Sequence, residues 1–227
     1  SLHDALPICF ETTDRRDFYD LAVGNVPFGN YKVNDKAYNK LGFSIHNYFF
    51  AKAIDQVRPG GVVAFVTSRY TMDSKDSTAR KYMAERADLL GAIRLPNNAF
   101  KANAGTDVVS DIIFLQKRDR PADIEPAWVQ LGKTEDGFAI NQYFVDHPEM
   151  VLGQLTLEST QYGHDLTVAP IEGAVLADQL AEAVQHIEGN YTAVEIAAPD
   201  VADAEAQRKT LPADPTVKNF SYTVVDG

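Results

Sequence analysis

The chain has one cysteine and no long apolar run, and each absence excludes a class of protein. Cys9 alone forms neither an internal disulfide nor a cysteine-based zinc site, and no histidine has metal-ligand spacing, so no metal is expected. A membrane helix needs ~18–20 apolar residues in a row, so we expect no membrane partner. No basic segment precedes an apolar one after Ser1, so we expect no signal peptide and a cytoplasmic location.

Basic residues are scarce in the second half of the chain. Residues 1–120 hold 17 Lys and Arg against 14 Asp and Glu, whereas residues 121–227 hold 4 against 18. These balances of +3 and −14 make up the net charge of −11. Contacts to phosphate need Lys and Arg, so only the first half is expected to face a polyanion. The second half is typical of a solvated spacer or an interaction segment.

Short apolar runs in the first half predict strands that are buried on both faces. They are Tyr19–Gly24, Val62–Thr67, Leu89–Leu95 and Val108–Gln116. Runs of this length without alternation are typical of central strands in a parallel sheet. The last run partly alternates, which favours an edge or antiparallel strand.

Helical patterns separate these runs. Ser44 is the expected N-cap of a helix that Pro59-Gly60-Gly61 ends, and a second helix is expected from about Ser77 to Asp88. Alternating strands and helices predict an α/β fold with a doubly wound, Rossmann-like sheet that is mostly parallel, with an antiparallel last strand.

The order of patterns predicts five segments along the chain. Residues 1–10 fit poorly with the rest of the chain and are a doubtful, non-native start, and residues 11–120 form the α/β sheet domain. Residues 121–165 are irregular, with a short hairpin of Trp128–Leu131 and Phe138–Phe144 around Asp136-Gly137. Residues 166–190 hold an amphipathic helix over Ile171–Ile187, and residues 191–227 form an acidic, flexible tail.

The candidate site is Asn25-Val26-Pro27-Phe28, directly after the first strand. Ligands of open α/β sheets bind beyond the carboxyl ends of the strands, so the position suits a site. The Asn25 side-chain oxygen and a backbone carbonyl fixed by Pro27 are two acceptors suited to the amine of a nucleobase, and Phe28 offers a face for stacking. The alternative is an ordinary strand-to-loop turn, in which Asn and Pro are common.

Together with the elements downstream of it, this segment resembles the Asn-Pro-Pro-Tyr/Phe motif of the N6-adenine DNA methyltransferases, which use S-adenosylmethionine. The helix from Ser44, the strand to Ser68, Arg94-Leu95-Pro96 and the strand ending at Lys117 come in the family's order. The resemblance covers roughly Asp20–Gly153. It is strongest to type I modification subunits and to methyltransferase segments of large helicase-like proteins of mobile elements.

The resemblance implies a fragment of an enzyme that transfers a methyl group from S-adenosylmethionine to a flipped adenine, with DNA and helicase regions of the parent polypeptide as partners. By position, Asn25 would accept from the adenine amine through its side chain and Val26 through its carbonyl. Phe28 would stack on the base, and Phe100 would be a second aromatic contact. A core position is the alternative for Phe100.

Two features depart from the family's pattern. Val26 stands where the family usually has its first proline, which lowers the rigidity expected of the backbone. Nothing upstream resembles the Gly-rich turn that cradles the cofactor, so the cofactor-binding residues are unknown. We therefore expect this fragment to be inactive by itself.

Basic residues near the predicted site are candidates for contacts to DNA phosphates. They are Lys32, Lys36 and Lys40 in the loop after Phe28, and Arg69 after the second strand. A solvated loop is an equally good interpretation of the three lysines. Two other functions also fit the sequence: a non-catalytic DNA-targeting or scaffolding domain that keeps the fold, and a methyltransferase acting on protein glutamine.

Overall fold

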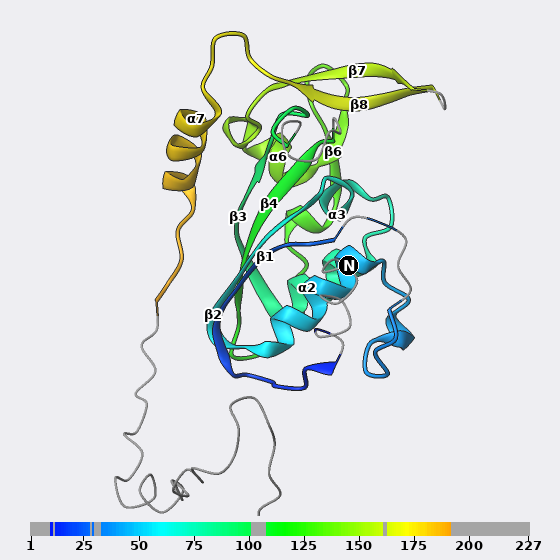
Figure 1. Cartoon of the computed structure of the whole chain (residues 1–227), viewed down its shortest axis with the longest axis vertical. Helices are drawn as coiled ribbons and strands as arrows, with labels where there is room; N and C mark the ends of the chain where they lie inside the picture. Colours follow the sequence, from blue (N-terminus) through cyan, green and yellow to red (C-terminus); the bar gives the residue numbers. More distant parts are fainter. Residues whose placement is uncertain are drawn as a thin grey trace, which may run out of the picture. The chain divides into compact units, whose positions relative to one another are not determined.

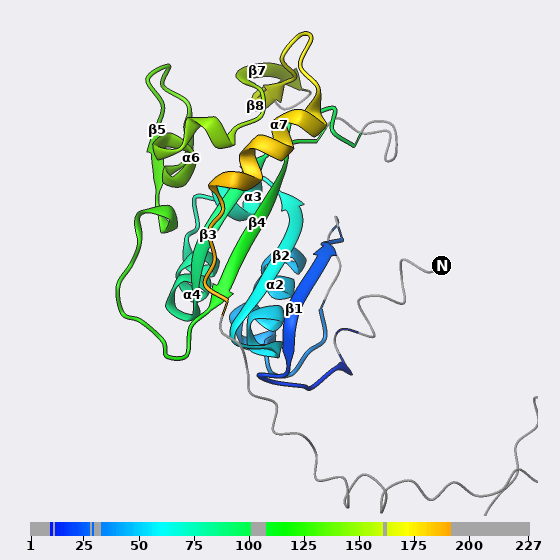
Figure 2. The same ribbon diagram turned by 90° about the vertical axis from the view of Figure 1, so that its left-hand side faces the viewer.

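The computed structural model describes residues 10, 12–27, 29, 33–100, 108–160 and 163–191, which belong to one compact unit. Its centre is a mixed sheet with the strand order β1-β2-β4-β3 (Figures 1 and 2). The strands are β1 (Tyr19–Asn25), β2 (Val57–Ser68), β3 (Ala87–Arg94) and β4 (Ser110–Lys117). Strand β1 pairs parallel to β2, and β4 pairs antiparallel to both β2 and β3. The carboxyl ends of β1, β2 and β3 therefore lie at one rim of the sheet.

This sheet confirms the predicted α/β fold and the antiparallel last strand. The last strand is not at an edge, however, because β4 lies between β2 and β3. Its position explains its pattern: Ile113 and Leu115 are buried, and Ile112 and Phe114 are partly covered, so both faces of β4 carry apolar side chains.

Helices α2 (Ile45–Gln56) and α4 (Thr78–Arg86) lie on the same face of the sheet (Figure 2). Ser44 caps α2 as predicted, because its hydroxyl accepts a hydrogen bond from the backbone N–H of Asn47 at 3.4 Å. Phe50 is fully buried and its ring lies 5.2 Å from the ring of Phe65 on β2. Burial of such aromatic and aliphatic side chains between helix and sheet is the main stabilising contribution in this part of the chain.

The boundary between α2 and β2 differs from the prediction. Helix α2 ends at Gln56, and β2 begins at Val57, so Pro59-Gly60-Gly61 lies within the strand and does not precede it. The pairing register between β1 and β2 shifts between Tyr19 and Leu21, which marks a bulge. The glycines make this irregularity possible: Gly60 has a φ of +79°, and a Cβ on Gly61 would lie 2.8 Å from the Arg58 carbonyl oxygen.

The segment after β4 is more regular than the sequence predicts. A hairpin does turn at Asp136-Gly137, where Gly137 has a φ of +87°, but its strands β5 (Leu131–Lys133) and β6 (Ala139–Asn141) are short. Trp128 lies in the 3-10 helix Ala127–Val129, and α6 (Gln142–Asp146) replaces the predicted end of the second strand. A second hairpin of β7 (Gln154–Thr160) and β8 (Gly163–Ala169) comes after the 3-10 helix Pro148–Met150.

The boundary predicted at residue 120 does not separate two cores. Trp128, Ile140 and Phe144 are 7% exposed or less, and they pack in one apolar cluster with the side chains of the sheet. Arg94 at the end of β3 also forms a parallel bridge with Val151. The segment therefore completes the core of the sheet domain.

The predicted helix over Ile171–Ile187 is shorter in the structure. Helix α7 covers Leu176–Ala183 and continues as the 3-10 helix Val184–His186. Ile171 is 50% exposed and precedes the helix, whereas Leu176 and Leu180 pack on the core. Figure 2 shows α7 on the sheet face opposite α2 and α4. Of the doubtful start (residues 1–10) the structure describes Phe10, whose ring stacks on that of Phe49 at 4.7 Å, and of the acidic tail (residues 191–227) it describes Tyr191. The other residues of these two segments lie outside the described part of the chain. No helix of the described ranges is long and apolar enough to cross a bilayer.

Candidate nucleobase site

Asn25 and Val26 lie where β1 ends, at the rim that collects the carboxyl ends of the parallel strands. Asn25 is the last residue of β1, is exposed, and pairs with Val66 of β2. The N–H of Val26 then donates to the Val66 carbonyl at 2.9 Å. Hydrogen bonding to the sheet thus continues to Val26, one residue after the end of β1. The next residue, Pro27, is partly buried. Phe28 lies outside the described residues.

Val26 fixes the backbone at the end of β1 in a way that the comparison with the family's proline did not predict. Its side chain is 2% exposed and belongs to the core cluster, while its N–H is bonded to β2. A proline at this position has no N–H and could not make that bond. The backbone is therefore fixed here by a buried side chain and a hydrogen bond, in place of a ring.

An apolar groove of about 510 Å³ runs along β1 beside the site. Ala22 and Gly24 line it from β1, Val26 lines it directly after that strand, and Phe49 and Phe65 line it from α2 and β2. Leu21 and Val23 of the same strand are 56% and 68% exposed, and β1 pairs with β2 alone among the described strands. One edge of β1 is thus an open strand edge with apolar neighbours, a feature that soluble proteins normally cover.

The loop after the site is tied to α2 through a buried carboxylate, Asp35. It accepts hydrogen bonds from the Lys52 ammonium at 2.7 Å, the Tyr48 hydroxyl at 3.0 Å and the Ala37 N–H at 3.1 Å. Burial alone would raise the pKa of Asp35, but the hydrogen bonds from Lys52, Ala37 and Tyr48 outweigh it and hold the pKa below its ordinary value. Residues 33–42 are thereby anchored to α2.

The anchored loop presents two of the predicted basic residues to solvent. Lys36 and Lys40 are exposed, and Tyr38 between them is buried with its hydroxyl bonded to Asp55 at 2.5 Å. Burial and the Asp55 carboxylate together raise the pKa of Tyr38. Lys32 lies outside the described residues. Lys36 and Lys40 remain predicted phosphate contacts.

Arg69 has carboxylate partners that sequence reasoning missed. It is 9% exposed, donates to Asp165 of β8 at 2.6 Å and lies 3.7 Å from Asp73. Its guanidinium also stacks on the Tyr70 ring at 4.4 Å. Arg69 therefore joins the end of β2 to the β7–β8 hairpin, and these bonds would have to break before it could grip a phosphate.

A second buried arginine, Arg94, organises the same rim. It is fully buried, makes two bonds of 2.8 Å to Asp111 and one of 2.7 Å to Asp73, and stacks on Phe144 at 4.3 Å. Burial would lower the pKa of Arg94, but Asp111 and Asp73 raise it above its ordinary value, so the guanidinium stays charged. Sequence analysis did not predict this cluster, because Arg94 is 17 positions from Asp111 and 21 positions from Asp73.

Phe100 lies in the turn after β3, partly buried against the main core cluster. The turn is fastened to β8, because Asn97 donates from its N–H to the Val168 carbonyl at 2.8 Å and from its amide to Thr167 at 3.1 Å. In the sheet order, β2 and β4 separate β3 from β1. Phe100 and Asn25 thus share a rim but not neighbouring strands, and residues 101–107 lie outside the described part of the chain.

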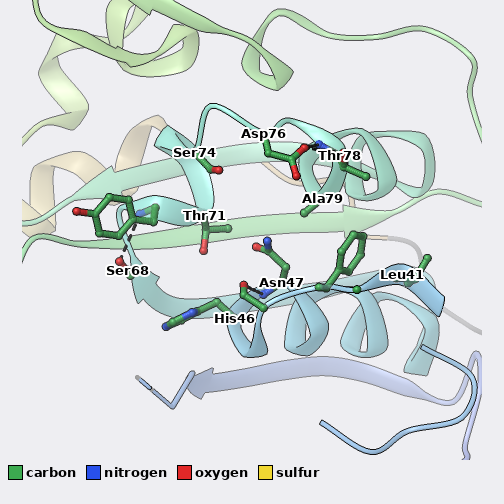
Figure 3. A pocket seen from close by; sticks show the side chains of 13 residues that line it. Leu41, His46, Asn47, Ser68, Thr71, Ser74, Asp76, Thr78 and Ala79 are labelled. Carbon is green, nitrogen blue, oxygen red and sulfur yellow. Dashed lines mark hydrogen bonds between the residues drawn. The ribbon is translucent and has the colours of Figure 1, made fainter. Parts of the chain in front are cut away.

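A polar pocket of about 380 Å³, which the sequence did not indicate, opens beside the end of β2 (Figure 3). It lies between the start of α2, which contributes His46 and Asn47, and the segment from α3 (Tyr70–Asp73) to α4. Burial holds the pKa of His46 below its ordinary 6.5, so this ring is neutral at pH 7. The residues that line the pocket come from two stretches of chain, 41–47 and 68–79, and sequence spacing gives no sign that these converge.

No family model matches the chain. A curated relative, the Defense against restriction protein B of Escherichia phage P1, is 35% identical over 112 residues, which are 48% of this chain and 5% of that protein. The chain therefore corresponds to a small part of this relative's length.

Solved structures with a similar arrangement include a Listeria monocytogenes protein named as a candidate class I S-adenosylmethionine-dependent methyltransferase. It has a TM-score of 0.40 and 21% identity over 51% of this chain and 36% of its own. The M protein of the type I restriction enzyme EcoKI has a TM-score of 0.34 and 18% identity over 44% and 21%. At TM-scores below 0.5 these two likenesses carry no argument about the function of this chain.

Proposed function

We propose that this chain is the base-binding part of a DNA adenine-N6 methyltransferase within a longer polypeptide. The observation that carries the proposal is the place of Asn25-Val26-Pro27 at the carboxyl end of a parallel strand, with the Val26 backbone bonded to β2 at 2.9 Å. The order of strands and helices around it also agrees with the resemblance of the sequence to that family.

The proposed chemistry depends on two acceptors for one amine. The lone pair of an adenine N6 amine is delocalised into the ring, so the nitrogen is a poor nucleophile. The Asn25 amide oxygen and the Val26 carbonyl would accept its two N–H bonds and favour tetrahedral geometry at the nitrogen as it attacks. No shifted pKa is required, because the proton leaves after the methyl group has been transferred.

S-adenosylmethionine would supply the electrophilic methyl group in this proposal. Among the described residues, the apolar groove beside Asn25 would form one wall of a cofactor site. The sequence before Asn25 does not resemble the Gly-rich motif that cradles this cofactor in the family. We propose that further chain of the parent pairs with the open edge of β1 and completes the cofactor site. Exposed Leu21 and Val23 would be covered in that pairing.

The phage relative supports a parent that is much longer than this chain and acts in the context of restriction. Its name assigns it to defence against restriction, and the matched region is 5% of its length. By analogy we propose that the parent carries further regions, with helicase regions among them, and that DNA is its partner.

A non-catalytic DNA-targeting domain is the second candidate, and the ion pairs favour it. Arg69 and Arg94 are bonded to carboxylates, Lys52 is bonded to Asp35, and Lys36 and Lys40 stay exposed on the described part of the loop. A weakly basic surface of this kind suits transient contact with DNA better than a tight grip.

The test uses the complete parent protein and plasmid DNA. Methylation is read with a nuclease that is sensitive to N6-methyladenine, for the wild type, for Asn25→Ala and for Asn98→Ala, a matched change at an exposed position. We expect Asn25→Ala to lose at least about a hundredfold in rate, as removal of one oxyanion-hole donor does in other enzymes, and Asn98→Ala to retain it. Methylation that survives Asn25→Ala would remove the catalytic proposal, and an inactive wild type would favour the second candidate.

A further inference from the structure

The polar pocket between α2 and the α3–α4 segment has the size of a small-molecule site. Its volume of about 380 Å³ falls in the ~300–1,000 Å³ range of such pockets. Figure 3 shows the Asn47 amide pointing into the space from α2, with Thr71, Ser74 and Asp76 on the opposite wall. The Oδ1 atom of Asn47 is buried and accepts no hydrogen bond from the described residues. A buried amide oxygen in this state favours a ligand that brings an N–H or O–H donor.

The charges in the pocket restrict which ligand it can hold. Thr78 donates to Asp76 from its N–H at 2.9 Å and its hydroxyl at 2.6 Å, and these bonds keep the pKa of this exposed carboxyl below its ordinary value. Asp76 is thus ionised at pH 7, and among the described residues lining the pocket it carries the one formal charge when His46 is neutral. Arg80 lies near enough to lower the pKa of Asp76, but it is buried and donates to the carbonyls of Val129, Thr71 and Ser74. The one formal charge on the pocket wall is thus negative, which disfavours phosphates and carboxylates and favours a neutral ligand with an amine donor.

Aromatic side chains stand at two sides of the pocket. Tyr70 is 57% exposed, and Arg69 covers one side of its ring at 4.4 Å. Phe43 lines the pocket from the loop before α2 and packs edge-to-face on Tyr82 at 5.6 Å. A flat heteroaromatic ring gains stacking energy from such neighbours, whatever its hydrogen-bond pattern.

The pocket opens at the same rim as the proposed site. Ser68 lines it and ends β2, two residues after Val66, which pairs with Asn25 on the adjacent strand. We propose that the pocket receives a nucleobase with an exocyclic amine, a base of the strand that presents the target adenine at Asn25. Resting on the proposed function, this inference adds a second, base-selective contact to it.

The amide and carboxylate define which bases fit. Asn pairs in general with the N6 and N7 positions of adenine, and Asp accepts from the N4 amine of cytosine. Thymine has no exocyclic amine and offers one donor, its ring N3–H, whereas an exocyclic amine offers two, so Asn47 Oδ1 or Asp76 would lack a donor when thymine enters. We expect deoxyadenosine and deoxycytidine to bind about tenfold more tightly than thymidine, the effect of one unmade hydrogen bond.

The experiment is a nucleoside titration of the isotope-labelled 227-residue chain, monitored by NMR. Deoxyadenosine should shift the amide signals of residues 44–47 and 71–78, and thymidine should shift them about tenfold more weakly. Asn47→Leu should weaken deoxyadenosine binding by about tenfold, and Tyr70→Ala should weaken all three nucleosides. Gln185→Leu, a matched change on the exposed 3-10 helix after α7, should change none of them.

The inference fails if no nucleoside shifts these signals, if thymidine binds as well as deoxyadenosine, or if folded Asn47→Leu binds like the wild type. Should Asn47→Leu not fold, the Tyr70→Ala comparison and the preference among nucleosides still decide. Because the titration needs no methyl transfer, its result is separate from that of Asn25→Ala. Loss of the methylation proposal with a positive titration would leave the pocket as a nucleobase site of a non-catalytic domain.

Discussion

Arg94 shows how one side chain holds the rim together at the scale of single residues. It is fully buried and bonded to Asp111 and Asp73, and Asp73 in turn accepts from the N–H of Asn141 at 2.9 Å. The Asn141 amide donates to the carbonyls of Met72 and Trp128 at 2.8 Å. A network in which every member is satisfied fixes one arrangement, whereas the loss of one member leaves buried charge.

Replacement of Arg94 should therefore be among the most destabilising single changes in the chain. Arg94→Met leaves Asp111 and Asp73 buried without their partner, so we expect a loss of about 3–5 kcal/mol in the free energy of unfolding. Urea unfolding monitored by circular dichroism measures it. Arg120→Met is the control, because Arg120 is 88% exposed in its pair with Asp119 and should change stability by less than about 0.5 kcal/mol. Equal unfolding midpoints for the two variants would contradict the role of the network.

Asp35 predicts a pH dependence of the loop at residues 33–42. The folded pKa of Asp35 is held below 3.8, so its contribution to stability is present above about pH 4 and is lost as the pH falls through the folded pKa. We expect the wild type to lose more stability than Asp35→Asn between about pH 5 and about pH 2, measured by thermal unfolding. Above about pH 5 the variant should be the less stable of the two, since it gives up the ion pair with Lys52.

At the scale of elements, the irregular start of β2 depends on Gly61. A Cβ on this residue would lie 2.8 Å from the Arg58 carbonyl and 3.0 Å from the Asp20 carbonyl, both of them backbone atoms. Gly61→Ala should cost about 1–3 kcal/mol in unfolding free energy, as overpacking does. Gly24→Ala on β1 is the matched control, because its Cβ would meet only the Phe65 ring at an ordinary 3.7 Å. Comparable stabilities of the two variants would show that the bulge tolerates a side chain.

The elements that the sequence predicted well are those with a strong local pattern. Apolar runs located the four strands of the sheet, and Ser44 located the start of α2, because capping and burial act within a few residues. The predicted boundary between α2 and β2 was wrong because Pro59-Gly60-Gly61 usually form a turn between elements. Here these residues lie within β2, next to a bulge in its pairing with β1. The sequence also predicted correctly that Asn25 lies at the end of the first strand, because the apolar run that marks this strand stops directly before it.

What the sequence did not predict depends on contacts between distant residues. The sequence predicts Arg69 to be a candidate for phosphate contact, because its partner Asp165 on β8 is 96 positions away. The polar pocket likewise combines the start of α2 with the α3–α4 segment. The β7–β8 hairpin was missed because its apolar residues are few and separated by polar ones. Leu155 and Leu166 pack on the core and Val168 is buried, whereas Leu157 is 56% exposed.

At the scale of the whole molecule, β1 leaves one strand edge and two aliphatic side chains open. Leu21 and Val23 are more than half exposed beside the apolar groove. We expect the isolated chain to self-associate through this edge at high concentration, and Val23→Lys to suppress the association, because edge charges oppose strand pairing. Light scattering at increasing concentration measures it. A change to lysine at Tyr191, which is 86% exposed and remote from β1 in sequence, should leave the association as it is.

The core shared between the sheet and residues 127–183 has a consequence for dissecting the polypeptide. Cutting after residue 120, where the composition turns acidic, would remove Trp128, Ile140 and Phe144 and uncover the apolar surface on which they rest. Such a shortened piece would expose apolar side chains of this cluster to water and would be prone to precipitate. The smallest piece worth producing for the nucleoside titration therefore extends through the residues after α7, where Asn190 exchanges two hydrogen bonds with Gln116 of β4.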